Sequence, residues 1–395
     1  MEHPGAGTFG GQAGRNGATA GSVAQDWPVP APDEDHPVDA DLPARVEREL
    51  VDYLDTRRAE AQAADPAFAD AVDALRGFVL GGGKRIRPTF AWWGWRAGGG
   101  DPGGAEAPAV LRAISALELL QAGALIHDDL IDASAVRRGA PTIHVAFAGR
   151  HRQHGWLGQP ERFGLGVAVL LGDIALTWAD DMLADSGLPA APLRRCRAPW
   201  QRMRTEMLAG QYLDIFTQVT GNESADAALR VDRLKTAAYT VERPLHLGAA
   251  IAGADPAAVE ALRSFGADIG VAFQLRDDLL GVFGDPEVTG KPAGDDLREG
   301  KRTLLVAVAL ERARERGEHA AAETLRSALG RPDLDEGTVR TVQGLLTDLG
   351  AVRAVEDRIA ALTEGALGTL RAAPITRTAV AALTQLAVTA TERTS

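Results

Sequence analysis

Two groups of aspartates, each at the end of an apolar run, are the first candidates for chemistry in this sequence. Asp128, Asp129 and Asp132 form the first group, and Asp277 and Asp278 form the second. On a helix, Asp128 and Asp132 share one face because side chains four residues apart are neighbours. Carboxylate oxygens suit a hard cation such as Mg²⁺, which commonly binds one or two carboxylates together with substrate phosphates. A single group fits a solvated helix end equally well, whereas two groups facing each other across a bundle would hold several Mg²⁺ ions around one polyanion.

Cationic segments accompany both aspartate groups. Residues 81–88 read GGGKRIRP, Arg137 and Arg138 follow the first aspartate group, and Lys291 and Lys301 follow the second. The first segment is not a nucleotide-binding P-loop, because arginine follows its lysine where Ser or Thr is required. Taken singly, each segment is typical of a solvated surface. Together they indicate a pocket with metal-binding carboxylates on one side and Arg/Lys groups on the other, a design that binds diphosphate.

Helices must position these groups, because helical periodicity dominates the chain from Leu42 onward. Apolar residues recur on one face of the first segment at Val46, Leu50 and Leu54. The same period recurs in residues 201–219, 228–251, 257–283, 335–349 and 351–371. No Asn-Gly hairpin flanked by alternating strands occurs, and only a Gly/Pro-rich stretch at 284–294 interrupts the pattern. We therefore predict one all-α domain over residues 42–395.

Composition limits the class of protein. Of the 395 residues, 45% are hydrophobic, and 54 acidic against 42 basic residues leave a net charge of -12. This surplus argues against bulk electrostatic binding to nucleic acid or to an anionic membrane. Residues 1–41 are rich in Gly, Ala and Pro and hold few large apolar side chains, so we predict a disordered acidic tail. The single cysteine, Cys196, fits a reducing cytoplasm, and the absence of an uninterrupted apolar run or a signal pattern predicts no transmembrane segment.

The motifs as a set resemble those of the trans-isoprenyl diphosphate synthases of the polyprenyl synthetase family, in particular the bacterial geranylgeranyl type. They run in family order as GGGKRIRP, DDLIDASAVRRGAPT, GQYLD (210–214), KTAAYT (235–240) and FQLRDDLLGVFGDPEVTGKPAGDD (273–296). The resemblance implies an isoprenoid synthase fold, a single-domain helical bundle with its site in a central cavity, and a homodimer. It also implies head-to-tail condensation of isopentenyl diphosphate with dimethylallyl, geranyl or farnesyl diphosphate. Three Mg²⁺ ions, or Mn²⁺ in their place, are expected.

The resemblance also implies a role for each matching residue. The metal ligands fall on Asp128, Asp132 and Asp277, with Asp129 and Asp278 completing the two motifs. The isopentenyl diphosphate site falls on Lys84, Arg87, Gln121 and Arg138. The allylic diphosphate site falls on Arg137, Lys235, Thr236, Gln274, Lys291 and Lys301. The helix at Lys235 and Thr236 is expected to kink and aim carbonyl dipoles at the allylic cation.

The second motif departs from the family pattern. It should end in aspartate, but position 281 is glycine, and Asp285 comes one helical turn further on. Because the first aspartate of this motif is the usual direct ligand, we expect metal binding to survive.

Product length is expected to depend on the residues that precede the first motif. Gly123 and Ala124 are too small to block a growing chain, and Leu119 and Leu120, one turn deeper, are expected to form the floor. The alternative is that Gly123 and Ala124 merely permit close helix packing. We expect geranylgeranyl diphosphate (C20); farnesyl diphosphate (C15), a C25 or longer product, and a non-catalytic subunit of a heteromeric synthase are the alternatives. A class I terpene cyclase shares the first aspartate group but has no use for an isopentenyl site.

Overall fold

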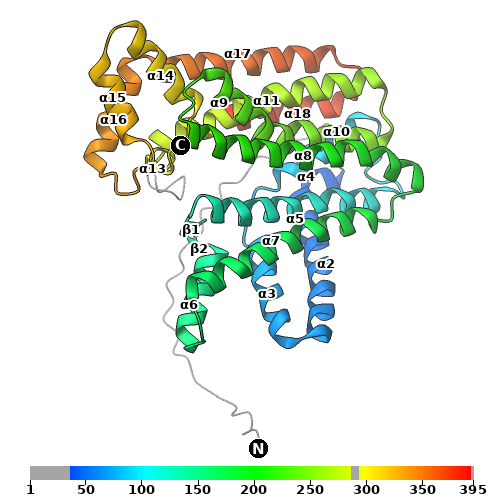
Figure 1. Cartoon of the computed structure of the whole chain (residues 1–395). Coiled ribbons are helices and arrows are strands. Elements are labelled where there is room, and N and C mark those ends of the chain that lie inside the picture. Colours follow the sequence, from blue (N-terminus) through cyan, green and yellow to red (C-terminus); the bar gives the residue numbers. More distant parts are fainter. Residues whose placement is uncertain (1–35, 286–292, 393–395) are drawn as a thin grey trace, which may run out of the picture.

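The computed structural model describes residues 36–285 and 293–392, which form a bundle of helices (Figure 1). The first half contains α1 (Pro37–Ala40), α2 (Leu42–Ala64), α3 (Pro66–Leu80), α4 (Ile86–Ala97), α5 (Ala107–Ile131), β1 (Val136–Arg137), β2 (Ala140–Pro141), α6 (Ile143–His154) and α7 (Pro160–Ala184). The second half contains α8 (Ala190–Thr220), α9 (Ala225–Val231), η1 (Asp232–Glu242), α10 (Arg243–Ala252), α11 (Pro256–Phe283), α13 (Asp295–Glu299), α14 (Leu304–Glu315), α15 (His319–Ala328), α16 (Glu336–Asp348), α17 (Ala351–Ala372) and α18 (Arg377–Thr391). The predicted all-α fold is confirmed.

Helix α11 connects two hydrophobic cores. Its N-terminal part, with Phe265 and Ile269, packs into the larger core, which is built around α4, α5, α7, α8 and α10. Its C-terminal part, with Leu275 and Leu279, packs into a second core formed with α14, α15, α16 and α17. Figure 1 shows α14, α15 and α16 gathered at one end of the molecule. Because one continuous helix belongs to both cores, the second aspartate motif at its C-terminal end is held rigidly by both.

Helices α5 and α7 are long and apolar enough to cross a membrane, judged by length and hydropathy alone. In α5, 72% of the most apolar stretch is buried, as expected of a helix at the centre of a core. In α7 only 33% is buried, and Leu165, Val169 and Leu170 are exposed. Helix α7 therefore presents apolar side chains that the other described residues leave exposed, and Leu165 and Val169 among them line a cavity.

A π-helix, η1, follows α9 within residues 228–251, a segment for which the sequence predicted a helix with a kink at Lys235 and Thr236. Glycines on the two neighbouring helices allow the wider turn to fit. A Cβ on Gly210 of α8 would lie 2.2 Å from the Lys235 nitrogen, and a Cβ on Gly270 of α11 would lie 2.6 Å from Ala237 Cα. Lys235 and Thr236 both lie on this π-helix. Turns of this kind are frequent at functional sites.

A short hairpin follows α5, although the sequence carries no Asn-Gly signal for one. Val136 pairs with Pro141 and Arg137 with Ala140 in antiparallel register. The turn is Arg138–Gly139, whose φ values of 52° and 75° suit a two-residue hairpin turn. The turn places Arg137 and Arg138 next to the end of the first aspartate motif.

The predicted boundary of the N-terminal tail, at residue 41, is wrong. Pro37–Ala40 form α1, and Asp39 is only 2% exposed. The Asp39 carboxylate accepts a 2.6 Å hydrogen bond from the Trp92 indole and lies 3.1 Å from the Arg96 guanidinium. These long-range partners offset the low apolar content on which the prediction relied. Residues 1–35 of the predicted tail lie outside the described residues.

Candidate active site

A cavity of about 1510 Å³ lies among α5, α7, α8, η1 and α11, bounded also by the loop at residues 81–85, the hairpin and α13. It gathers most of the predicted site residues from segments far apart in the sequence. Those on its wall are Lys84, Arg87, Gln121, Ala124, Asp128, Asp132, Arg137, Arg138, Lys235, Thr236, Gln274, Asp277, Asp278 and Lys301. Among the described residues, the predicted members that do not line it are Leu119, Leu120, Gly123 and Asp129. Lys291 lies outside the described residues.

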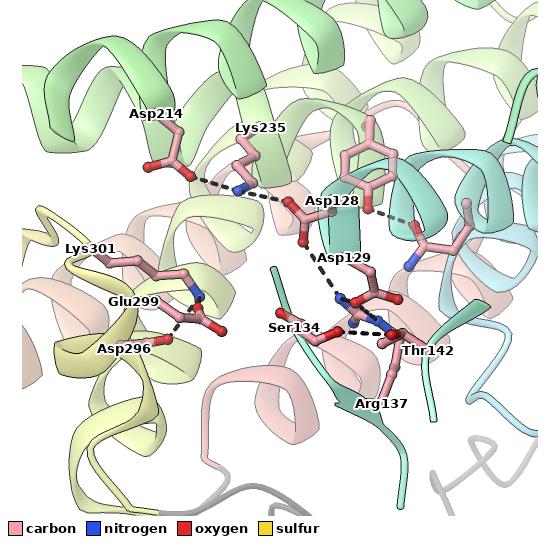
Figure 2. A network of polar contacts seen from close by, with 12 residues as sticks. Asp128, Asp129, Ser134, Arg137, Thr142, Asp214, Lys235, Asp296, Glu299 and Lys301 are labelled. Carbon is pink, nitrogen blue, oxygen red and sulfur yellow. Dashed lines mark hydrogen bonds and ion pairs between the residues drawn. The ribbon is translucent and has the colours of Figure 1, made fainter. Parts of the chain in front are cut away.

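The first aspartate motif presents Asp128 and Asp132 to the cavity from the C-terminal end of α5. Asp128 Oδ1 lies 3.1 Å from Lys235 Nζ, and Asp128 Oδ2 lies 3.5 Å from the Arg137 guanidinium (Figure 2). Burial opposes the charged form of Asp128, but Lys235, Arg137 and Lys301 together outweigh burial, so the pKa of Asp128 is lowered. Burial and the neighbouring Asp128 raise the pKa of Asp132 to about 7. Ionisation of Asp128 is thus favoured by its neighbouring cations, whereas ionisation of Asp132 is opposed by burial and by Asp128.

The second aspartate motif lines the same cavity from α11. Asp278 is 3% exposed, and its Oδ1 accepts a 2.6 Å hydrogen bond from the Gln274 amide. Within the described part of the chain, Asp278 Oδ2 and Asp232 Oδ2 are buried without a hydrogen-bond partner. Burial raises the pKa of Asp278 well above its ordinary value, with Asp232 and Asp296 adding to the effect, and burial with Asp214 raises that of Asp232 to about 8. Burial thus favours the neutral form of both carboxyl groups, and a cation placed beside these oxygens would favour the ionised form instead.

The donor set fits Mg²⁺. No three His, Cys, Asp or Glu side chains among the described residues converge as a ready-made metal cage. Mg²⁺ does not need one, because it usually keeps several waters and binds through one or two carboxylates plus substrate phosphates. Both motifs offer carboxylate oxygens, some of which have no hydrogen-bond partner, and carboxylate oxygens are the ligands that Mg²⁺ prefers.

Lys235 and Lys301 are each held between carboxylates beside the cavity (Figure 2). Lys235 Nζ lies 2.6 Å from Asp214 Oδ2 as well as near Asp128. Lys301 Nζ lies 2.8 Å from Asp296 Oδ1 and 2.7 Å from a Glu299 oxygen. Burial lowers the pKa of both ammonium groups, but these carboxylates outweigh it and raise the pKa overall. Both lysines therefore stay protonated in a buried site, as binding to a phosphate oxygen requires.

Another part of the cavity wall combines the loop at residues 81–85 with the hairpin turn. Gly82 and Gly83 have φ values of 99° and 132°, which L side chains rarely adopt. The Arg138 guanidinium donates a hydrogen bond to the Gly82 carbonyl, so the loop and the turn hold each other. Beneath the loop, the buried Arg85 lies 2.8 Å from Glu118 of α5 and donates to the Val79 carbonyl at 3.0 Å. Lys84 and Arg138 are thereby fixed on the same side of the cavity.

Arg87 and Gln121 meet through Tyr239, for which no role was predicted. The Arg87 guanidinium lies 4.1 Å from the centre of the Tyr239 ring and donates a 2.8 Å hydrogen bond to Thr240. The Tyr239 hydroxyl donates a 2.5 Å hydrogen bond to Gln121 Oε1. Cation–π contact and hydrogen bonding together orient two predicted isopentenyl diphosphate ligands from η1.

Asp129 faces away from the cavity, which contradicts its placement at the reacting centre. Its side chain is 1% exposed, and its Oδ1 lies 2.7 Å from one Arg137 nitrogen and accepts a 2.8 Å hydrogen bond from another. Asp129 is thus buried outside the cavity lining, where it positions the Arg137 side chain.

Leu119, Leu120 and Gly123, which were predicted to control product length, do not line the cavity. A Cβ on Gly123 would lie 2.7 Å from Leu176 Cγ and 2.9 Å from the Gly172 carbonyl, so Gly123 permits close packing of α5 against α7. Leu119 and Leu120 are fully buried in the core and do not form a cavity floor. Of the four predicted residues, Ala124 alone lines the cavity formed by the described residues. The apolar part of the wall comes from Ala124, Leu125, Leu165, Val169, Leu176, Met207, Leu208 and Phe273.

Sequence reasoning assigned no role to several polar residues that line the cavity, among them Asp214, Asp232, Tyr239 and Asp296. Asp214, Tyr239 and Asp296 stand inside the quoted motifs GQYLD, KTAAYT and PAGDD, so their motif membership was an available signal. Asp232 precedes the KTAAYT motif and stands in none of the quoted segments. Only its burial beside Asp214 and Lys235 identifies it.

The fold and the site define a class of protein: an all-helical bundle that sets buried carboxylates against arginines and lysines at the mouth of an apolar cavity. The chain belongs to the polyprenyl synthetase family, because the family model "Polyprenyl synthetase" matches residues 70–345. It is 34% identical to a geranylfarnesyl diphosphate synthase of Aeropyrum pernix over 75% of this chain and 85% of that one. It is 35% identical to a geranylgeranyl diphosphate synthase of Mycobacterium tuberculosis over 65% of this chain and 67% of that one.

Solved structures agree with this assignment. A geranylgeranyl pyrophosphate synthase from Corynebacterium glutamicum, complexed with isoprenyl diphosphate and magnesium, superposes with a TM-score of 0.86 at 48% identity. The match covers 89% of this chain and 99% of that one. The chain is therefore a prenyltransferase of the polyprenyl diphosphate synthase class.

Proposed function

We propose that this prenyltransferase condenses isopentenyl diphosphate with an allylic diphosphate and releases geranylgeranyl diphosphate (C20). One observation carries the proposal: Asp128, Asp132 and Asp278 line a single cavity together with Arg and Lys side chains from separate segments and several apolar side chains. This arrangement suits two diphosphates and one growing hydrocarbon chain. Similarity to geranylgeranyl diphosphate synthases from two bacteria supports the C20 product.

Asp128, Asp132 and Asp277 are the residues that would hold Mg²⁺, with three ions expected. When bound, Mg²⁺ supplies positive charge that stabilises a departing diphosphate. The buried oxygens of Asp278 and Asp232 that lack a hydrogen-bond partner support this assignment, since a cation beside them would favour the ionised form that burial opposes. Asp129 orients Arg137 toward the same region.

The cations bind and orient the two substrates. Lys235, Lys301 and Arg137 hold the allylic diphosphate, together with Thr236, Gln274 and Lys291. Lys84, Arg87, Gln121 and Arg138 hold isopentenyl diphosphate on the loop side of the cavity. Cleavage of the allylic C–O bond leaves a carbocation, which the C4 end of the isopentenyl unit attacks to form the new C–C bond. A proton leaves the isopentenyl unit and is taken up by the released diphosphate, which balances the reaction.

Lys235 and Thr236 lie on the π-helix, whose widened turn supports a second role for this segment. A π-helical turn changes the direction of backbone carbonyls relative to an α-helix. Carbonyl oxygens directed at the cavity stabilise the allylic carbocation electrostatically while the C–O bond breaks.

A homodimer is part of the proposal. Helices α7 and α8 flank the cavity, and outside the cavity they expose Leu170 on one and Tyr212, Phe216 and Val219 on the other. Large apolar patches on a protein surface typically mark an interaction site. Light scattering coupled to gel filtration should give twice the chain mass, and Leu170→Asp combined with Val219→Asp should shift it toward the monomer.

We place the enzyme in the cytoplasm on the basis of its cysteine usage. Cys196 is the single cysteine, it is buried, and burial raises its pKa to about 12. A chain with one buried thiol needs no oxidising compartment. The net charge of -12 supports the absence of a nucleic-acid partner.

Product analysis tests the proposal. Purified protein is incubated with Mg²⁺, isopentenyl diphosphate and, in turn, dimethylallyl, geranyl or farnesyl diphosphate, and chain lengths are measured by chromatography after dephosphorylation. A dominant C20 product is expected. Farnesyl or C25 and longer products would replace the C20 assignment, and no product with any primer would favour a non-catalytic subunit of a heteromeric synthase.

A further inference from the structure

The space beside Gly281, where the second motif departs from the family pattern, is filled by another carboxylate. A Cβ built on Gly281 would lie 1.9 Å from Asp296 Oδ2 and 2.5 Å from Asp296 Cγ. No side chain can share that space, because real Cβ atoms do not approach other heavy atoms this closely. Gly281 and Asp296 both line the cavity. The carboxylate of Asp296 thus stands where an aspartate at position 281 would begin.

Asp296 is held there from two directions. The Gly294 amide donates a 3.1 Å hydrogen bond to the Gly281 carbonyl, which fixes the start of α13 against the end of α11. Gly294 has a φ of 76°, so this connection needs a left-handed backbone. On the far side, Lys301 Nζ lies 2.8 Å from Asp296 Oδ1. Lys301 binds one oxygen of Asp296 while Oδ2, the other oxygen, lies against Gly281.

Asp285, the next acid after the motif, does not fill this space. Helix α11 ends at Phe283 and its C-cap is Gly284 in extended conformation, so Asp285 no longer follows the helical face of the motif. Asp285 is exposed and stands outside the cavity lining formed by the described residues. Asp278, one turn before Gly281, is by contrast buried and sits close enough to Asp296 for the two charges to repel.

We propose that Asp296 replaces the missing aspartate of the second motif, and that glycine at 281 is required so that the Asp296 carboxylate can reach the metal side of the site. The inference rests on the proposed Mg²⁺-dependent function. It assigns Asp296 as an additional residue that orients the Mg²⁺–diphosphate complex, supplied by α13 rather than by α11. Lys301 positions Asp296 through the Oδ1 contact.

Binding of Mg²⁺ together with inorganic pyrophosphate, measured by titration calorimetry, tests this without turnover. Asp296→Asn keeps the shape and removes the charge, and should weaken binding by about 10- to 100-fold, the usual cost of losing a residue that supports a metal site. Gly281→Ala should weaken binding similarly, because its methyl group displaces the carboxylate. The double variant should be no weaker than the stronger single one, since both changes remove one interaction. Asp295→Asn, with the same charge change on the same helix, is the matched control.

A swap of the two side chains separates position from charge. Gly281→Asp combined with Asp296→Gly returns the carboxylate to α11 and should restore most of the binding lost in Asp296→Asn. A swapped protein that binds no better than Asp296→Asn would overturn the equivalence of the two positions. Asp128→Asn distinguishes a failure of the Asp296 inference from a failure of the proposed function. If Asp128→Asn abolishes binding while Asp296→Asn binds like the unaltered protein, the inference on Asp296 fails and the proposed function stands. If neither variant changes binding, the proposed metal site itself fails.

Discussion

Lys235 Nζ, on the π-helix, lies 3.1 Å from Asp128 Oδ1, at the end of α5. This contact pairs a proposed diphosphate ligand with a proposed metal ligand. When Mg²⁺ and diphosphate bind, Lys235 can form an ion pair with a phosphate oxygen, and Asp128 can bind the metal. The site is therefore charged and preorganised beforehand, which spares reorganisation during the reaction.

Removing Asp128 should abolish condensation without unfolding the protein. We expect Asp128→Ala to lower kcat/KM by at least about 10³-fold, because metal-assisted stabilisation of the leaving group supplies several kcal/mol. Incorporation of labelled isopentenyl diphosphate measures the activity, and circular dichroism measures the fold. Asp226→Ala, at an exposed position of α9, should leave both unchanged. Near-normal turnover in Asp128→Ala would contradict the assignment of the site.

Lys235 and Lys84 should affect different substrates. Lys235→Gln removes a charge-assisted contact and is expected to raise KM for the allylic substrate by about 10- to 100-fold, corresponding to about 1.5–3 kcal/mol. Lys84→Gln, on the opposite wall, should instead raise KM for isopentenyl diphosphate. Initial rates with one substrate varied and the other saturating give both constants. Equal effects of either variant on both substrates would argue against two separate diphosphate sites.

Asp132 should make the metal-free protein less stable as the pH rises. Its pKa is raised from an ordinary value of 3.8 to about 7 by burial and by Asp128. The folded chain therefore holds a proton that the unfolded chain has released, so the contribution of Asp132 is complete below about pH 4 and is lost as the pH rises through about 7. Melting temperatures of the unaltered protein and of Asp132→Asn should diverge across this window, with the Asn variant less sensitive to pH. Parallel curves would disprove the assignment.

The same protonation predicts how Mg²⁺ binding responds to pH. A carboxylate must lose its proton to bind metal, so affinity for Mg²⁺ with pyrophosphate should increase as the pH rises toward about 8. Calorimetry in buffers of different ionisation enthalpy should detect proton release at about pH 6. Equal proton release from the unaltered protein and from Asp132→Asn would show that Asp132 is not the group that loses a proton, since pyrophosphate itself releases protons when it binds Mg²⁺.

Glu118 should matter for stability because it balances a buried cation. Arg85 is 4% exposed and lies 2.8 Å from Glu118, so Glu118→Ala leaves a buried guanidinium without its main partner. Breaking a buried ion pair on one side typically costs about 3–5 kcal/mol, which urea unfolding would detect. Asp357→Ala removes one partner of an exposed pair with Arg353 and should cost less than about 0.5 kcal/mol. Equal losses in the two variants would contradict the anchoring role of Arg85.

Substitutions at Ala124 and Gly123 should affect different properties: the first should change product length, and the second should change the packing of α5 against α7. Ala124→Phe adds bulk to the cavity wall and should shorten the dominant product from C20 to C15. Gly123→Ala places a methyl group 2.7 Å from Leu176, so it should lower the melting temperature, at a cost of about 1–3 kcal/mol typical of overpacking. Its product length should not change. A shorter product from Gly123→Ala at unchanged stability would reverse the two roles.

Much of the fold and the chemistry could be predicted because the signals are local. Apolar residues at helical spacing predicted the helices that contain both aspartate motifs, and α8, α11, α16 and α17 begin and end near the predicted limits except at the first end of α8. Side chains four apart share a helix face whatever the surroundings, so Asp128 and Asp132 could be placed together. Cationic motifs beside them then indicated a polyanion.

Other roles required the tertiary structure. Adjacent residues on a helix point about 100° apart, so the rotation of α5 in the bundle decides which neighbour faces the cavity. That rotation brings Asp128 and Ala124 to the wall and turns Asp129 and Gly123 toward Arg137 and α7.

The sequence by itself determined an all-helical prenyltransferase with two aspartate motifs and their matching cations, because periodicity and residue type act over short distances. Only the tertiary structure decided that Asp296 lies over Gly281, that Tyr239 links Arg87 to Gln121, and that Asp39 belongs to the folded domain. These contacts join segments that are separate in the chain. Their geometry follows from how whole helices pack, which no local pattern encodes.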